Sequence, residues 1–244
     1  MANKLTTENI EAAVQHLENI QSGKTPILDG ADRTVEDTKD DRIDLGNQTF
    51  EQHQRKKSLK VYPLISPNDP RLLMQIAPFM DNTLEHFGFA SRKALAEVMY
   101  DNMAKYGGLG LSANQVGLPY RMFIMGGHPE IEDGKVRCVF NPLINDVSEE
   151  SVLMKEGCLS FPFLFLGIKR PKWVNVRYTD ENGEEIEETL HGMPARMFQH
   201  ENEHMNGYVF TDLVSKLKLE RAEISKKKMI KEIQKRQRGL QIIT

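Results

Sequence analysis

The stretch Phe198–Gly207, FQHENEHMNG, contains two histidines and a glutamate in the order His-Glu-x-x-His. Residues four apart lie on the same face of a helix, about one turn from each other, so His200 and His204 can both reach one metal ion. Glu201 lies beside them, where a carboxylate can accept and donate protons. This spacing predicts a metal site on a helix, with its own base.

A third protein ligand for this site is expected upstream, at Cys158 in the segment EGCLS. A cysteine thiolate with two imidazoles leaves the fourth tetrahedral position to water, as a catalytic metal requires. A closed structural site would need a further Cys or His. The other thiol, Cys138 in CVFNPLI, is more typical of a buried strand residue. The alternative for the helix itself is a pair of solvent-facing histidines.

The composition is that of a globular protein with one sizeable domain: 244 residues, 39% hydrophobic, with a net charge of −3. That charge gives no general reason to expect nucleic-acid binding, and we expect no DNA partner. Two cysteines cannot form a disulfide framework, which indicates a reducing compartment. Residues 1–20 have no apolar signal core, and no apolar run is long enough to span a bilayer. We therefore expect a cytoplasmic protein that does not contact membranes.

Three regions are expected along the chain. Residues 1–58 form a polar extension, with a weak helical pattern over 5–21 followed by a segment poor in large apolar residues. Such a segment cannot bury enough surface to offset its ordering entropy, so we expect flexibility, with a docking element for a partner as the alternative. Residues 59–214 form the catalytic domain, and residues 215–244 a basic C-terminal helix and tail.

The hydrophobic patterns predict an α+β domain in which several antiparallel strands precede one central helix. The turn sequence at Asp180–Gly183 predicts that the strands on either side of it form a hairpin. The expected helices are Arg71–Phe79, Ala90–Tyr106 and Pro194–Met205, and the expected strands are Arg121–Met125, Val136–Phe140, Trp173–Thr179 and Glu185–Leu190.

A further helix is expected over Ser215–Arg238, with a partial apolar face and a polar face dominated by lysine and arginine. It could be a solvated amphipathic helix that covers the sheet, or it could bind a phosphate backbone. The residues after it, Gly239–Thr244, are a short apolar tail that can form a last strand.

The glycines of GGLGLSANQ, at Gly107–Gln115, indicate a close approach of the backbone to another group. Gly108 and Gly110 allow the chain to pass where a Cβ would obstruct it. The side chain of Gln115 offers both a carbonyl acceptor and an amide donor. A dinucleotide loop is not expected, because the third glycine is missing, and a phosphate loop would need a Lys-Ser/Thr ending.

Three motifs in this order resemble those of peptide deformylases: GLGLSANQ at Gly108–Gln115, EGCLS at Glu156–Ser160 and QHENEH at Gln199–His204. The resemblance covers roughly Leu59–Leu217. It implies antiparallel β-sheets packed around the metal-binding helix, and removal of the N-formyl group from the initiator methionine of formylated nascent peptides. It also implies a ferrous iron, Fe²⁺, that Zn²⁺, Ni²⁺ or Co²⁺ can replace.

The resemblance assigns roles to the residues of the central site. Cys158, His200 and His204 would hold the metal, which lowers the pKa of its bound water. The resulting hydroxide would attack the formyl carbon. Glu201 would take the water proton and hand it to the leaving amine.

Two more sets of residues match family positions. The Gln115 side-chain amide and the Leu159 backbone N–H would stabilise the oxyanion. The backbone of Gly108, Leu109 and Gly110 would line the peptide-binding cleft, and the methionine side chain would enter an apolar pocket.

Outside these sets, Glu156 and Arg170 match family positions and are expected to form a charge pair that orients the metal motif. Three residues depart from the usual pattern. Ser112 replaces a common alanine and brings a hydroxyl that needs a partner. Arg196 and Met197 stand where apolar or cysteine residues are frequent, and Arg196 could change the rim of the substrate pocket.

The family's C-terminal helix can dock on the ribosome, and the basic helix of this chain resembles that element. The chain could come from a bacterium, from a phage that uses the host cytoplasm, or from an organelle. Two other classes stay open. A zinc metallopeptidase would take its third ligand downstream, where Glu220 and Glu223 are available. A non-catalytic metal-binding or ribosome-associated protein would have no use for Glu201.

Overall fold

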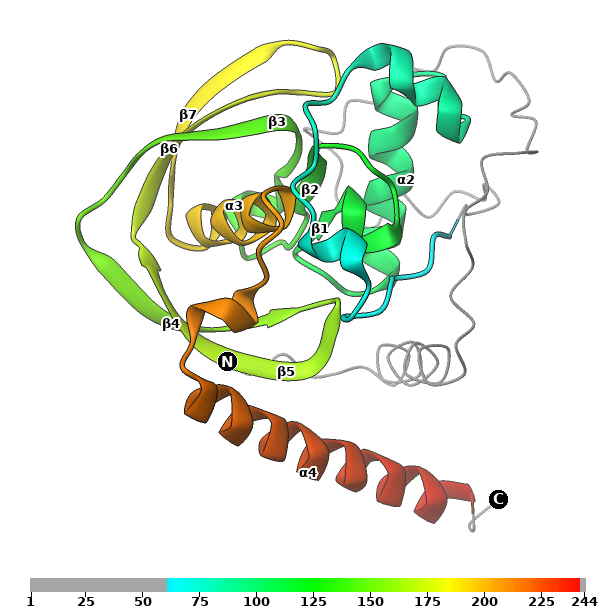
Figure 1. The fold of residues 1–244 in the computed structure, drawn as a ribbon, viewed down its shortest axis with the longest axis vertical. Helices are drawn as coiled ribbons and strands as arrows, with labels where there is room; N and C mark the ends of the chain where they lie inside the picture. The colour runs from blue at the N-terminus through cyan, green and yellow to red at the C-terminus, as the bar shows by residue number, and fades with distance from the viewer. Residues whose placement is uncertain (1–60, 242–244) are drawn as a thin grey trace.

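The computed structural model describes the backbone of residues 61–241 and the side chains of residues 61–235 (Figure 1). The α+β fold predicted from the sequence is confirmed. Short 3₁₀ turns connect several of the elements. The helices are α2 (Arg92–Lys105), α3 (Gly192–Met205) and α4 (Lys216–Gln241), and the strands are β1 (Gly110–Ser112), β2 (Met122–Gly126), β3 (Val136–Val147), β4 (Ser151–Cys158), β5 (Phe161–Pro171), β6 (Trp173–Thr179) and β7 (Glu185–His191).

The strands form two separate antiparallel sheets. Five of them are hydrogen-bonded in the order β1-β2-β3-β6-β7, and β4 pairs only with β5 as a two-stranded hairpin. The predicted pairing of β6 with β7 is confirmed, and Gly183 in the turn between them has a φ of +83°. At the base of the hairpin, the Ser148 amide donates to the Trp173 carbonyl and the Lys172 amide donates to the Glu150 carbonyl, which joins the hairpin to the ends of β3 and β6.

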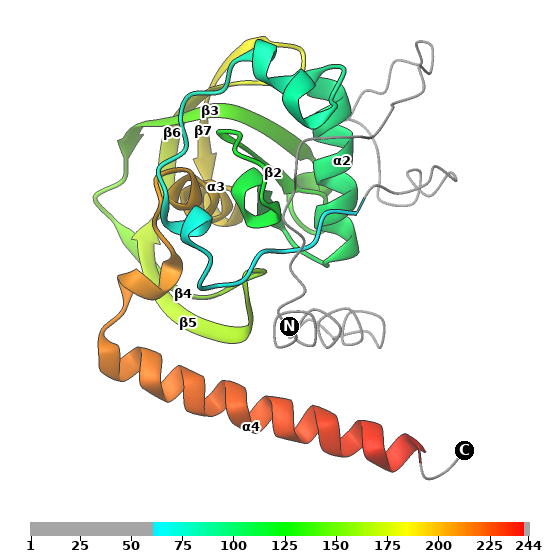
Figure 2. The ribbon, with the colours of Figure 1, turned by 45° about the vertical axis from the view of Figure 1, so that its right-hand side comes forward.

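Helix α3 lies between the five-stranded sheet and the β4–β5 hairpin (Figures 1 and 2). Its apolar side packs into a core cluster in which Ala195, Phe198 and Met205 join Phe123 and Val176 of the sheet. Its other side faces the hairpin with polar residues. The prediction of a central helix inside antiparallel strands is confirmed, although the helix begins at Gly192 rather than Pro194.

Helix α2 covers another part of the five-stranded sheet. Leu95, Met99 and Met103, at helical spacing, are buried in a core cluster with Leu111 of β1 and Met122 of β2. The predicted helix and its apolar stripe are confirmed, with Ser91 accepting a hydrogen bond from the Ala94 amide as the N-cap. Strand β1 is thus packed from one side by α2, and this fixes the glycine-rich segment that contains it.

The predicted helix over Arg71–Phe79 is wrong. Only Pro70–Leu73 forms a 3₁₀ turn, capped by Asp69, and the chain is then extended. Gln75 makes an isolated β-bridge with Asn206, and the Ile76 amide donates to the Met205 carbonyl. These tertiary hydrogen bonds replace the local ones that a helix would need.

The strand predictions missed the β4–β5 hairpin and the second half of β3. Strand β3 continues past Phe140 to Val147 because bulges, one of them next to Asn141 with a φ of +51°, carry the strand across Pro142. In β5, Pro162 and Gly167 interrupt the strand-like sequence, although the residues from Leu164 on alternate between buried and exposed.

Helix α4 confirms the predicted C-terminal helix, but it continues to Gln241, so the predicted strand at its end is wrong over 239–241. Near its start, Leu219 and Ala222 pack on a small cluster with Leu166 and Ile168 of the hairpin. The rest of α4 runs away from the body in both views (Figures 1 and 2). None of the helices in residues 61–241 is long and apolar enough to cross a membrane.

The expected helix over residues 5–21 and the tail beyond residue 241 lie outside the described residues. The region boundaries at 58/59 and 214/215 stay predictions.

Candidate metal centre and active site

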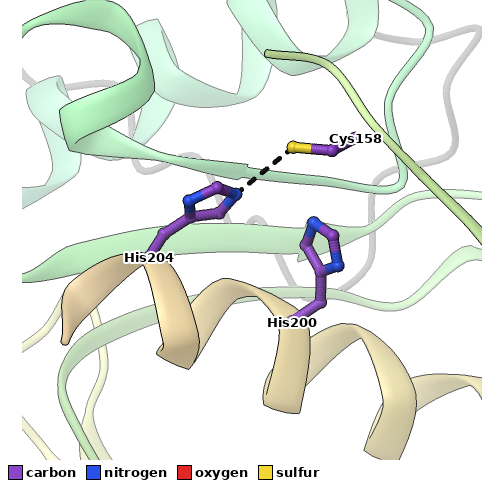
Figure 3. Close-up of side chains that lie close together, drawn as sticks. All are labelled: Cys158, His200 and His204. Atoms are coloured by element: carbon purple, nitrogen blue, oxygen red, sulfur yellow. Dashed lines mark hydrogen bonds between the residues drawn. The ribbon is translucent and has the colours of Figure 1, made fainter. Parts of the chain in front are cut away.

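Helix α3 and the end of strand β4 bring three metal-ligating side chains together (Figure 3). The ligand atoms of Cys158, His200 and His204 all lie within 4.8 Å of one another, and Cys158 Sγ is 3.3 Å from His204 Nε2. This is the set predicted from the sequence. The alternative third ligands, Glu220 and Glu223, belong to α4 and to no such group among the described residues.

The donor atoms fit a divalent metal. His200 Nδ1 lies 3.2 Å from Glu156 Oε2, which leaves Nε2 of that ring for ligation. His204 Nδ1 is buried without a hydrogen-bond partner in the described part of the chain, while its Nε2 faces the thiol. Burial lowers the pKa of His204, so its imidazole stays neutral, as a metal ligand must be. Three ligands of this kind leave a fourth position open.

Glu201 points from α3 toward strand β1. It is buried, and the Ser112 hydroxyl donates a hydrogen bond of 2.6 Å to its Oε2. Burial raises the pKa of the Glu201 carboxyl above its usual value, and the Ser112 hydrogen bond opposes that rise. A carboxyl whose pKa is raised is a stronger base than an exposed carboxyl, which suits a residue that takes up a proton and passes it on. The partner that the Ser112 hydroxyl needed is therefore the candidate base itself.

The glycines of the first motif pass close to this base and to the cysteine motif. A Cβ on Gly110 would overlap Glu201 Oε1, and a Cβ on Gly108 would lie 2.7 Å from Leu159 Cδ1. The close approach predicted from these glycines is confirmed, and the groups approached are site residues. Among the described strands β1 lies at the edge of the five-stranded sheet.

The Gln115 side chain is fixed beside the ligand thiol. Its Oε1 accepts from the Ser112 amide at 2.8 Å, and its Nε2 donates to Ser160 Oγ at 3.0 Å. The same Nε2 lies 3.4 Å from Cys158 Sγ. The structure thus places Gln115, the predicted oxyanion donor, next to Cys158, a candidate metal ligand, and Leu159 follows Cys158 directly and packs against the core.

The predicted charge pair between Glu156 and Arg170 is confirmed, with Arg170 Nε 2.7 Å from Glu156 Oε1 and Nη2 3.0 Å from Oε2. Burial raises the pKa of Glu156, but hydrogen bonds with His200 and Arg170 outweigh it and bring the pKa to about 2. Glu156 is therefore ionised at neutral pH.

Two further members of this network were not expected from the sequence. Arg170 also pairs with Glu203, at 2.5 and 2.9 Å, and Arg196 pairs with Glu156. Arg196 is buried rather than placed at an open rim. Arg196 lies four residues before His200 and eight before His204. This spacing predicts that it lies on the same face of the helix as the two histidines.

The sequence matches the family model described as "Polypeptide deformylase" over residues 61–220. The chain is 44% identical to a peptide deformylase of Thermotoga neapolitana over 126 residues, which cover 52% of this chain and 74% of that protein. It is 39% identical to a peptide deformylase of Wolbachia pipientis subsp. Culex pipiens over 168 residues, covering 66% and 90%.

Solved structures agree. The peptide deformylase of Thermotoga maritima superposes with a TM-score of 0.56 at 37% identity, covering 64% of this chain and 98% of that one. The peptide deformylase of Legionella pneumophila superposes with a TM-score of 0.61 at 29% identity, covering 72% and 98%.

Proposed function

The chain belongs to the polypeptide deformylase family, and from this premise we propose which of its residues carry the reaction. Removal of the N-formyl group from nascent polypeptides is the known function of this family, and this chain is a hydrolase with that activity. The observation that supports the residue assignment is the convergence of Cys158, His200 and His204 beside the buried Glu201.

Cys158, His200 and His204 hold one divalent metal, for which we propose Fe²⁺ in the native protein and Zn²⁺, Ni²⁺ or Co²⁺ as substitutes. When bound, the metal lowers the pKa of a coordinated water and polarises the formyl group. Glu156 supports the assignment, because it accepts from His200 Nδ1 and so directs Nε2 of that ring to the metal.

Glu201 is the general base and then the general acid. Its carboxylate takes the proton of the attacking water and delivers it to the amine that leaves when formate is released. Its raised pKa supports the role of base, because a carboxylate with a raised pKa is a stronger base. Its burial supports the delivery of the same proton to the amine, because bulk water has little access to the carboxyl. The Ser112 hydroxyl orients one oxygen and leaves the other directed to the space near Gly110.

The oxyanion that develops on the formyl oxygen is stabilised by the Gln115 side-chain amide and the Leu159 backbone N–H. The position of Gln115 Nε2, 3.4 Å from the ligand thiol, supports this role. Gly108, Leu109 and Gly110 line the cleft for the formyl-methionyl peptide. Their position at the start of β1, which is an edge strand among the described strands, supports it, because an extended peptide can pair with an edge strand.

Three broader assignments complete the proposal. The catalytic domain spans residues 59–214 and carries the polar extension and the C-terminal segment on either side. The lysine-rich face of α4, which runs away from the body, contacts the ribosome, where nascent chains emerge. The protein acts in the cytoplasm of a bacterial cell, or in that of a host if a phage encodes it.

The assignment is tested with iron-loaded protein, purified anaerobically, and the substrate formyl-Met-Ala-Ser. We expect formate and free Met-Ala-Ser with both peptide bonds intact. Cleavage between residues would show a metallopeptidase instead, and the absence of any product would leave a non-catalytic metal-binding protein. Loss of co-sedimentation with ribosomes on truncation after Val214 tests the α4 contact, and unchanged co-sedimentation would contradict it.

A further inference from the structure

The three candidate metal ligands come from two different elements, the β4–β5 hairpin and helix α3. Cys158 ends strand β4 of the two-stranded hairpin, whereas His200 and His204 belong to α3, which packs on the five-stranded sheet. Backbone hydrogen bonds of Ser148 with Trp173 and of Lys172 with Glu150 join the base of the hairpin to the ends of β3 and β6. Side chains that cross from α3 to the hairpin add a second connection between the two sets of ligands.

Arg196 makes such a crossing. It lies on α3 four residues before His200, with only 5% of its surface exposed. Its guanidinium donates to the Val152 carbonyl on β4 at 2.6 Å and to the Ile168 carbonyl on β5 at 3.2 Å. It also forms an ion pair with Glu156 Oε1. One side chain of α3 thus holds both strands of the hairpin that carries Cys158.

The contact with Glu156 connects Arg196 to a metal ligand. Glu156 Oε1 is shared between Arg196 and Arg170 Nε, and Glu156 Oε2 faces His200 Nδ1. Holding one oxygen fixes the rotation of the carboxylate, and this sets where the other oxygen meets the imidazole. The guanidinium groups of Arg170 and Arg196 balance two carboxylates, those of Glu156 and Glu203. Removing the Arg196 guanidinium therefore leaves one negative charge in this network uncompensated.

We propose that Arg196 is a positioning residue of the metal centre. It fixes the hairpin and the Glu156 carboxylate against α3, so that Cys158 and His200 bind the same ion. The proposal rests on the proposed function of Cys158, His200 and His204 as the metal ligands. The contacts of Arg196 are with Glu156 and with the Val152 and Ile168 carbonyls of the hairpin, and it acts through them.

Arg137 provides a matched control. It is also 5% exposed and pairs with two carboxylates, Glu132 and Glu188, but it lies on β3 and ties that strand to β7 within the five-stranded sheet. The hydrogen bonds and ion pairs of Arg137 involve none of the site residues. Replacing either arginine by methionine removes a buried cation of the same kind, so the two variants should lose comparable stability.

The test loads wild type, Arg196→Met and Arg137→Met with Co²⁺ and measures three quantities: the melting temperature, the visible d–d absorption spectrum, and the rate of Co²⁺ transfer to an excess of chelator. We expect both variants to melt earlier. Only Arg196→Met should show an altered spectrum and release Co²⁺ about 10- to 100-fold faster, the usual effect of losing a group that orients a ligand. If Arg196→Met does not fold, Arg196→Lys is measured in its place, because it keeps the charge but loses the fork that spans Glu156 and the two carbonyls.

A spectrum and release rate unchanged from wild type, or equal to those of Arg137→Met, would overturn the proposal. The wild-type protein separates this outcome from a failure of the proposed function. If wild type binds no Co²⁺ through Cys158, His200 and His204, the metal centre itself is wrong and the positioning role falls with it. If wild type binds Co²⁺ and deformylates its substrate while the arginine variants do not differ, only the positioning role is wrong.

Discussion

Helix α3 is supported on two sides, and the two supports are built differently. Strand β1 belongs to the hydrogen-bonded five-stranded sheet and reaches α3 by close backbone approach at Gly110 and by the Ser112 hydroxyl, and both contacts are with Glu201. Among the described strands the β4–β5 hairpin forms its own two-stranded sheet, and charged side chains such as Glu156 connect it to α3 at His200.

The two supports therefore contact different residues of the site. Strand β1 contacts Glu201, the proposed base, whereas the hairpin contributes Cys158 and contacts His200 through Glu156. Cys158 and His200 are both candidate metal ligands. Changes on the β1 side should therefore reduce turnover while the metal stays bound. Changes on the hairpin side should release the metal more readily.

The largest effect is expected for Glu201→Gln. Glutamine keeps the size of the side chain but cannot take up the water proton, so kcat for formyl-Met-Ala-Ser should fall by about 10²- to 10⁴-fold. The metal content, measured by atomic emission, should equal that of wild type. A kcat within a factor of about ten of wild type would exclude Glu201 as the main base. Loss of the metal would contradict the expectation that changes on the β1 side leave the metal bound.

Next in size is Gly110→Ala. The new methyl group overlaps Glu201 Oε1 and must displace the carboxylate, and a misplacement of about 1 Å can cost about 10²-fold in rate. The metal should be retained. Gly167→Ala on β5 is the control, because the added Cβ there meets only Leu153 Cδ1 at 3.6 Å. Equal kcat values for the two alanine variants would contradict the role given to Gly110.

Glu156→Gln tests the hairpin side. The amide cannot balance the two guanidinium groups around it, and it orients His200 Nδ1 less strongly, so the metal affinity should fall by about 10- to 100-fold. The kcat of the fraction that retains metal should change less than in Glu201→Gln. Competition with a chelator measures the affinity. An unchanged affinity with a strongly reduced kcat would reverse the assignment of the two sides.

The smallest effect is expected for Ser112→Ala. The variant loses one hydrogen bond to Glu201 and leaves an empty space the size of a hydroxyl group. We expect kcat to fall by about 3- to 10-fold, consistent with the net free energy of about 1 kcal/mol for one such bond. The metal affinity should equal that of wild type in the same chelator assay. A change in affinity larger than the change in kcat would show that β1 also supports the metal.

Local sequence was sufficient for the features that depend on neighbours along the chain. The four-residue spacing of His200 and His204 places both on one face of α3. The apolar stripe at Leu95 and Met99 predicts the buried face of α2, and the turn after Thr179 predicts the hairpin of β6 and β7. In each case the determining contacts lie within one helix or one turn, so the periodicity of the sequence carries them.

The motifs also indicate that Cys158 and Gln115 belong to the same centre, but no feature of the sequence explains the distance between them physically. The Ser112 amide, three residues away, fixes the Gln115 side chain locally, but only the folded chain brings Cys158, 43 residues away, next to its Nε2. The helix wrongly predicted over Arg71–Phe79 is an error of the opposite kind, because there a local preference was followed and a tertiary contact decided the structure. Its propensity was local, and the hydrogen bonds of Gln75 and Ile76 with the end of α3 outweighed it.

The sequence by itself thus determined the helix that presents His200, Glu201 and His204, because an α-helix places residues four apart on one face. Only the tertiary structure decided what surrounds them: that Ser112 and Gly110 meet Glu201, and that Arg196 and Glu156 meet behind His200. These pairs are separated by 40 residues or more, and no short-range periodicity relates them. Their contacts arise only when the sheet, the hairpin and α3 pack together.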